Sequence, residues 1–206
     1  MDLIFLHGLG QNPSSWNETL SVLPQCIKAY CPDLLHLCED KDYEKMYLAF
    51  ENYVDDFSNS INLCGISLGA VLALNYTLDH ADKVSSLVLI APQYKMPKLL
   101  LRVQNIVFRI MPNTLFSKDG IAKQDIIRLT NSMRFLDFEE DLKNIVCPTL
   151  IICGQKDTAN IKAAKKMANL ISNAKLYLID KAGHEINVVA SKKLANAMSL
   201  FYQTNN

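Results

Sequence analysis

The chain has 206 residues, of which half are hydrophobic and a fifth are charged. These proportions are typical of one globular domain and exclude a disordered or fibrous chain. Lysine and arginine together number 21, as do aspartate and glutamate, so the formal net charge is zero and no nucleic acid partner is expected.

Residues 3–6 form a short apolar run that follows no basic leader and precedes no cleavage site of small residues. We therefore expect neither a secretory signal nor a membrane span there. The six cysteines are scattered along the chain and form no C-x-x-C pair. Reduced, buried thiols are expected rather than disulfides or a zinc site, which favours a cytoplasmic protein.

Short apolar runs alternate with stretches of helical spacing along most of the chain. The apolar runs predict strands at residues 3–6, 27–31, 61–64, 84–91, 149–153 and 175–179. The helical spacing predicts helices at residues 13–23, 42–57, 68–78, 161–171 and 185–202. This alternation predicts an α/β protein of three layers, in which helices cover both faces of a mainly parallel, six-stranded sheet.

A long interruption separates the fourth predicted strand from the fifth. It is rich in large apolar residues up to Pro112, and a second stretch of helical spacing follows. Asp137 and Glu140 resemble a capping box for a short third helix. Since a segment this long inside one domain is usually functional, we expect a helical cap at residues 93–144 on a core made of residues 1–92 and 145–206.

Gly65, Ser67 and Gly69 form a G-x-S-x-G pattern between a predicted strand and a predicted helix. In this context the serine stands on a sharp turn and its hydroxyl projects from the sheet. The glycines let the neighbouring backbones approach closely. The five residues alone are also compatible with an ordinary turn, but their place between strand and helix favours Ser67 as a nucleophile.

A serine nucleophile needs a base, and the base needs an acid that orients it. His184 lies between the last predicted strand and the last predicted helix, at the same edge of the sheet as Ser67, and is the expected base. Asp157, in the turn after the fifth strand, is the expected acid, although a helix N-cap is also compatible with its position. Asp180, at the end of the sixth strand, is the alternative acid.

The other three histidines have different explanations. His80 ends the helix after Ser67 and so belongs to the opposite edge of the sheet. His36 precedes the serine in the chain, which does not fit the order of serine, acid and histidine in such sites. His7 is expected to hold the loop after the first strand by hydrogen bonding.

Two backbone amides are placed to stabilise an oxyanion at this edge. The helix after Ser67 begins at Leu68, whose N–H is the first expected donor. The second is the N–H of Leu9, in the glycine-containing loop at residues 7–10. A dinucleotide-binding loop is the alternative for residues 7–10, but the G-x-G-x-x-G spacing is absent.

The segments HGLGQNPSSW, GISLGA, VSSLVLIAP, CPTLIICGQKD and AGHE follow the order found in one family of enzymes. Over nearly its whole length the chain resembles the α/β-hydrolase superfamily of esterase- and lipase-like serine hydrolases, with a shortened N-terminus and a small cap. The resemblance implies the α/β-hydrolase fold and a triad of Ser67, Asp157 and His184. It also implies an oxyanion hole from the backbone of Leu9 and Leu68.

The resemblance and the apolar cap suggest residues that bind substrate. Trp16 stands where this family often has an aromatic residue after the His-Gly loop, and we expect it to pack near the pocket. In the cap, Leu99, Val103 and Phe108 suggest an apolar pocket for an acyl chain. Packing of the cap onto the sheet explains the same cap residues equally well.

The expected function is hydrolysis of carboxylic esters with small or medium acyl groups. A thioesterase, or a C–C bond hydrolase or lyase with the same triad, is an alternative, because the fold does not decide the reaction. A non-catalytic ligand-binding regulator is another. Action at a membrane surface is the least supported, since two arginines make a poor basic face for the cap. The expected partner is a small acyl substrate, bound by a monomer or homodimer that needs no metal or organic cofactor.

Overall fold

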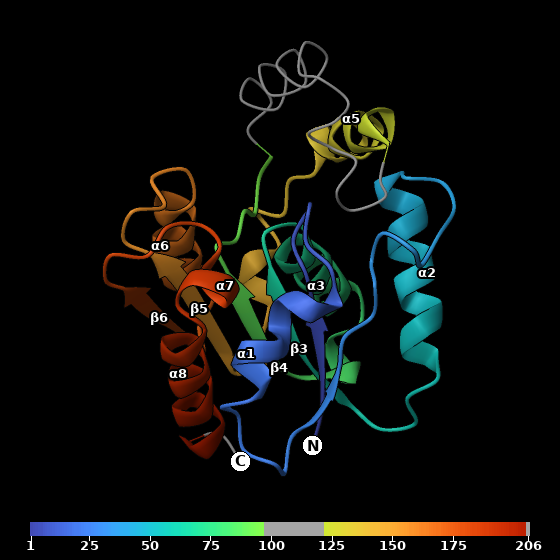
Figure 1. Ribbon diagram of the computed structural model, residues 1–206. Helices are drawn as coiled ribbons and strands as arrows, with labels where there is room; N and C mark the ends of the chain where they lie inside the picture. Colours follow the sequence, from blue (N-terminus) through green and yellow to red (C-terminus); the bar gives the residue numbers. More distant parts are fainter. Residues whose placement is uncertain (97–121, 205–206) are drawn as a thin grey trace.

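The computed structural model describes residues 1–96 and 122–204. Six strands form a sheet in the order β2-β1-β3-β4-β5-β6, and every neighbouring pair is parallel (Figure 1). The strands are β1 (Asp2–Leu6), β2 (Lys28–Tyr30), β3 (Ile61–Ile66), β4 (Val84–Ile90), β5 (Thr149–Gly154) and β6 (Ala174–Ile179). The predicted parallel sheet of six strands is confirmed.

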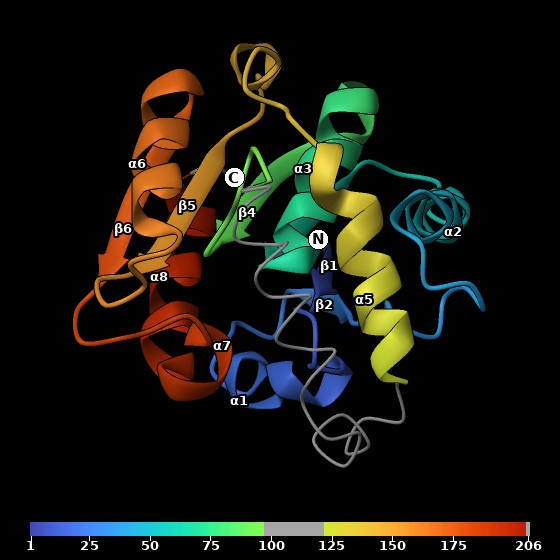
Figure 2. The same cartoon turned by 90° about the horizontal axis from the view of Figure 1, so that it is seen from above.

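Helices cover both faces of this sheet (Figure 2). One layer contains α1 (Asn17–Leu20), α7 (Ile186–Val189) and α8 (Ser191–Thr204), and the other contains α2 (Tyr43–Asp55), α3 (Leu68–Asp79) and α6 (Ile161–Leu170). Successive residues of a strand point to opposite faces, so in β1 Leu3 and Phe5 belong to the first core, and Ile4 and Leu6 to the second. Within residues 1–96 and 122–204, no helix has the length and apolar character needed to cross a membrane.

The strand order contains a switch point between β1 and β3. The chain leaves β1 and forms β2 on one side of it, then returns to form β3 on the other side. Loops that leave neighbouring strands in opposite directions open a crevice at the carboxyl ends of those strands. The loop at residues 7–10 and the turn at Ser67 follow the carboxyl ends of these two strands.

Helix α5 (Lys123–Ser132), in the segment between β4 and β5, lies beyond the carboxyl ends of the strands (Figure 1). It packs beside α2, and the Tyr43 N–H donates a hydrogen bond to Ser132 Oγ at 2.9 Å. Residues 94–96 and 136–138 meet in a short antiparallel bridge, which closes the two ends of the segment. The apolar stretch at residues 97–111, before Pro112, lies outside the described residues.

The expected capping box at Asp137 and Glu140 is wrong. Asp137 Oδ1 accepts a hydrogen bond from the Glu139 N–H at 3.2 Å, which is the geometry of a turn. The Asp137 carboxylate also forms an ion pair with Lys95 at 2.6 Å across the bridge. A short 3₁₀ helix follows only at Leu142–Asn144. Long-range pairing with Lys95 therefore replaces the local cap.

Two expected helices are interrupted. Residues 13–23 form a 3₁₀ turn, Pro13–Trp16, followed by the short α1. The closing helix expected at 185–202 is divided at Ala190, whose φ of −142° and ψ of 32° lie outside the helical region. The break turns α7 toward α1, where the side chain of Asn187 is hydrogen-bonded, while α8 packs along the sheet.

Candidate active site

Ser67 occupies a strained turn between β3 and α3. Its φ of 54° and ψ of −112° are unusual for a residue with a side chain, and such strain persists only where the surroundings impose it. The Ser67 N–H donates to Ile90 O of β4 at 3.0 Å, which ties the turn to the neighbouring strand. The turn thus stands at the carboxyl edge of the sheet, as the G-x-S-x-G pattern predicts.

The two glycines of the pattern are required by close backbone contacts. A Cβ atom added to Gly65 would lie 2.1 Å from the carbonyl oxygen of Gly69. A Cβ atom added to Gly69 would lie 2.1 Å from the carbonyl oxygen of Leu6 in β1. Since neither backbone oxygen can move freely, any side chain at these positions would displace the turn that carries Ser67.

Asp157 and His184 come together from the loops after β5 and β6. Nδ1 of His184 lies 2.8 Å from Oδ2 of Asp157. The carboxylate is buried, with 4% of its side chain exposed, whereas 43% of the imidazole is exposed. A distance of 2.8 Å between a nitrogen and a carboxylate oxygen requires a proton between them, so Nδ1 carries it and Nε2 is left as the basic nitrogen.

Ser67 and His184 are not joined in the structure. Within the described part of the chain, the Ser67 side chain has no hydrogen bond. Catalytic hydrogen bonds are often long or unformed before substrate binds. The roles of these two side chains therefore stay predictions.

Asn160 adds a second set of hydrogen bonds to Asp157. Its Nδ2 lies 2.9 Å from both carboxylate oxygens, and its backbone N–H donates to Oδ1 at 3.3 Å. Burial raises the pKa of the Asp157 carboxyl, but the hydrogen bonds from His184 and Asn160 outweigh burial and leave that pKa below its ordinary value. Asp157 is therefore held as an anion.

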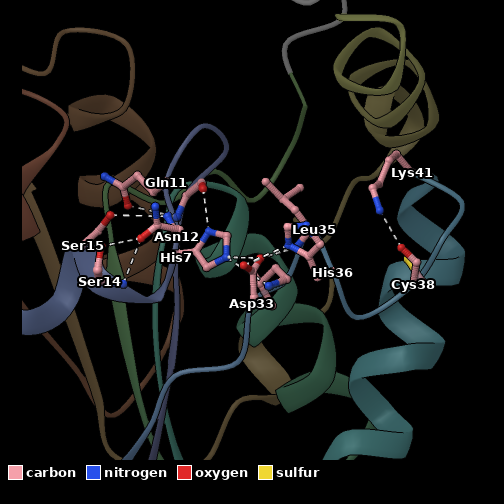
Figure 3. A network of polar contacts seen from close by, with 12 residues as sticks. His7, Gln11, Asn12, Ser14, Ser15, Asp33, Leu35, His36, Cys38 and Lys41 are labelled. Atoms are coloured by element: carbon pink, nitrogen blue, oxygen red, sulfur yellow. Dashed lines mark hydrogen bonds and ion pairs between the residues drawn. The ribbon is translucent and has the colours of Figure 1, made fainter. Parts of the chain in front are cut away.

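The loop after β1 is anchored by the side chains of His7 and Gln11 (Figure 3). Nδ1–H of His7 donates to Gly8 O at 2.9 Å, and Nε2 accepts from the Leu34 N–H at 3.0 Å. The Gly8 N–H donates to Gln11 Oε1 at 3.1 Å. His7 thus holds the loop, as the sequence predicts. Burial lowers the pKa of His7, although the Gly8 carbonyl and the Asp33 carboxylate oppose the shift.

Two amides are free at this edge. Neither the Leu9 N–H nor the Leu68 N–H donates to an acceptor within residues 1–96 and 122–204. Leu68 is the first residue of α3, so its N–H has no partner inside the helix. The two amides remain candidate donors to an oxyanion.

The alternative acid and bases lie elsewhere or have other partners. Asp180 is exposed at the end of β6, and the histidine pairs with Asp157 instead. His80 lies 2.6 Å from Glu51 at the opposite edge of the sheet. His36 lies 3.0 Å from Asp33 (Figure 3).

The predicted substrate-binding residues find less support. Trp16 is fully buried in the core beneath α1, α7 and α8, with its ring 5.0 Å from that of Phe5. This places Trp16 in the core, and its expected role near a substrate pocket stays a prediction. Leu99, Val103 and Phe108 lie outside the described residues.

Sequence reasoning missed three polar residues that build the site. Gln11 and Asn187 form reciprocal amide hydrogen bonds at 3.1 Å, which join the loop after β1 to α7. The 176 positions between them leave no local signal of the contact. Asn160 follows Asp157 by three residues, and this spacing was its only visible signal.

The fold and these residues define a class of protein. Residues 3–197 match the Alpha/beta hydrolase family, so the chain belongs to it. The fold and the similar proteins described next support a hydrolase within this family.

One relative is the pimeloyl-[acyl-carrier protein] methyl ester esterase of Vibrio atlanticus, which is 23% identical over 89% of this chain and 87% of its own length. An esterase from Exiguobacterium antarcticum superposes with a TM-score of 0.84 over 98% of this chain and 92% of its own, at 18% identity. MenH from S. aureus has a TM-score of 0.81 over 100% and 94%, at 22% identity. The two structural matches show a shared fold.

Proposed function

We propose that this protein is a serine hydrolase that cleaves carboxylic esters with small or medium acyl groups. The observation that carries the proposal is the strained Ser67 turn at the same sheet edge as the buried Asp157 and its partner His184. Strain of this kind concentrates at functional sites, and a core turn without chemistry does not need it.

In the proposed reaction, Ser67 Oγ attacks the ester carbonyl while Nε2 of His184 takes its proton. The Asp157 carboxylate holds Nδ1–H and stabilises the imidazolium that forms. The oxyanion accepts hydrogen bonds from the Leu9 and Leu68 amides, each worth roughly 3 kcal/mol in such sites. His184 then returns the proton to the leaving alcohol, and water releases the acyl group by the same steps.

The proposal that the substrates are esters rests on similar proteins. The Vibrio relative acts on a methyl ester, and the Exiguobacterium structure is an esterase. The scattered cysteines without a C-x-x-C pair support the proposal of a cytoplasmic enzyme. We propose that it needs no cofactor and works as a monomer or homodimer. Thioesters are the obvious second substrate to assay.

The test is turnover of p-nitrophenyl butyrate by wild type and Ser67→Ala. Without the nucleophile, we expect a loss of at least about 10³-fold in kcat. Ser85→Ala is the matched control, since Ser85 is exposed at the other end of β4 and should leave the rate unchanged. A fluorophosphonate should label Ser67 in folded protein. Equal rates in wild type and Ser67→Ala, or no labelling of Ser67, would contradict the proposal.

A further inference from the structure

The side chain of Asn160 faces both the proposed acid and the proposed base. Its Nδ2 lies 2.9 Å from each oxygen of Asp157 and 3.1 Å from Nδ1 of His184. Asn160 is 7% exposed. It stands at the N-cap of α6, where an asparagine usually accepts a hydrogen bond from its own helix, but its side chain makes no such bond. The side-chain amide of Asn160 therefore donates to Asp157 instead of capping its own helix.

The amide of Asn160 can serve only the carboxylate. Because Nδ1 of His184 already donates its proton to Asp157, the short approach of Asn160 Nδ2 to that nitrogen brings two donors together. The N–H groups of Asn160 are then directed at the two oxygens of Asp157. Donors on both oxygens keep the carboxylate plane from turning away from the imidazole.

Gln93 determines the orientation of the Asn160 side-chain amide. Its Nε2 donates to Asn160 Oδ1 at 2.8 Å and to Ala159 O at 3.0 Å. If the Asn160 amide were reversed, its nitrogen would meet the nitrogen of Gln93, and its oxygen would meet the carboxylate of Asp157. Both contacts would then be repulsive. Gln93 thus selects the useful orientation.

We propose that Asn160 is a positioning residue for Asp157 and that Gln93 orients it. Gln93 is the first residue of the segment 93–144, which follows β4. Through Gln93, this segment contacts Asn160 and so acts on the proposed acid. The inference rests on the proposed function, since Asn160 acts on Ser67 only through Asp157 and His184.

The first test is a titration that needs no turnover. The ¹³C shift of the Asp157 carboxyl, assigned with Asp157→Asn, is followed against pH in wild type and Asn160→Leu. Loss of the two hydrogen bonds should raise the pKa of Asp157 toward or above its ordinary value. Asn169→Leu, at an exposed position of α6, is the matched control and should leave the titration unchanged. The same Asp157 titration in folded Asn160→Leu as in wild type would overturn the proposal.

The second test compares two changes at Gln93, which is partly exposed and therefore tolerant of replacement. Gln93→Leu removes a donor, whereas Gln93→Glu places an acceptor against Asn160 Oδ1 and favours the reversed amide. We expect kcat for p-nitrophenyl butyrate to fall about tenfold or more in Gln93→Glu and less in Gln93→Leu, with KM unchanged.

Equal kcat values for the two Gln93 variants would overturn the orienting role. The two proposals fail separately. Absence of turnover by wild type would contradict the hydrolase function, whereas the carboxyl titration tests the positioning role without any substrate.

Discussion

The imidazole of His7 uses both of its nitrogens inside the protein. Nδ1–H donates to a carbonyl and Nε2 accepts from a backbone amide, so only the neutral ring satisfies both contacts. A proton added to Nε2 would face the Leu34 N–H and break the contact between the loops after β1 and β2. The loop with the Leu9 amide therefore depends on a neutral His7.

This dependence predicts how stability changes with pH. Because the pKa of His7 is lowered on folding, the unfolded chain binds the proton more readily. The stability from neutral His7 is complete above its ordinary pKa of 6.5 and is lost as the pH falls through the folded value. Denaturant unfolding between pH 7 and pH 5 should show a smaller pH dependence in His7→Asn than in wild type. Parallel curves for the two proteins would contradict this role.

At the scale of elements, the site is assembled by contacts between loops that are remote in sequence. The amides of Gln11 and Asn187 pair with each other, the Gly8 N–H joins this pair, and Asn187 also donates to Ser15 O. α7 begins two residues after His184, so the pair links the loop of the predicted base to the loop of the predicted oxyanion donor. The break at Ala190 lets α7 take this position.

The amide pair predicts coupled losses of stability. Gln11→Leu and Asn187→Leu should each lower the free energy of unfolding by about 1–3 kcal/mol, since each leaves a buried amide without its partner. The double variant should lose less than the sum of the two, because neither side-chain amide is then left without its partner. A double-mutant cycle in urea measures the coupling. Strictly additive losses would show that the two side chains act independently.

At the scale of the whole molecule, the sheet separates two cores. Trp16 is the single tryptophan of the chain and lies in the core beneath α1, α7 and α8. Trp16 therefore reports on the packing of this core. Ser67, Asp157 and His184 stand on three different loops at the carboxyl end of the sheet.

The position of Trp16 predicts its fluorescence. Emission of the folded protein should be at short wavelength and nearly insensitive to acrylamide, since the ring is 0% exposed. The loss of this emission in urea should coincide with the loss of helical circular dichroism, as expected for one cooperative domain. Strong quenching by acrylamide in the folded state would contradict the core assignment.

Much of this organisation could be predicted from local patterns. Apolar runs located the six strands, and the signal was clearest for β1, β3, β4 and β5, which are buried along most of their length. The role of the glycines around Ser67 could be predicted because close backbone contacts admit no side chain. The capping box at Asp137 failed because the ion pair with Lys95 depends on a neighbour 42 positions away in the chain.

By itself, the sequence determined the class of fold, the turn at Ser67 and the loops that carry Asp157 and His184, since each depends on residues close together in the chain. Only the tertiary structure decided that Asp157 pairs with His184, that Asn160 is hydrogen-bonded to both Asp157 and Gln93, and that Trp16 belongs to the core. These outcomes depend on which loops meet at the sheet edge, and hydrogen bonds between remote residues leave no periodic signal in sequence.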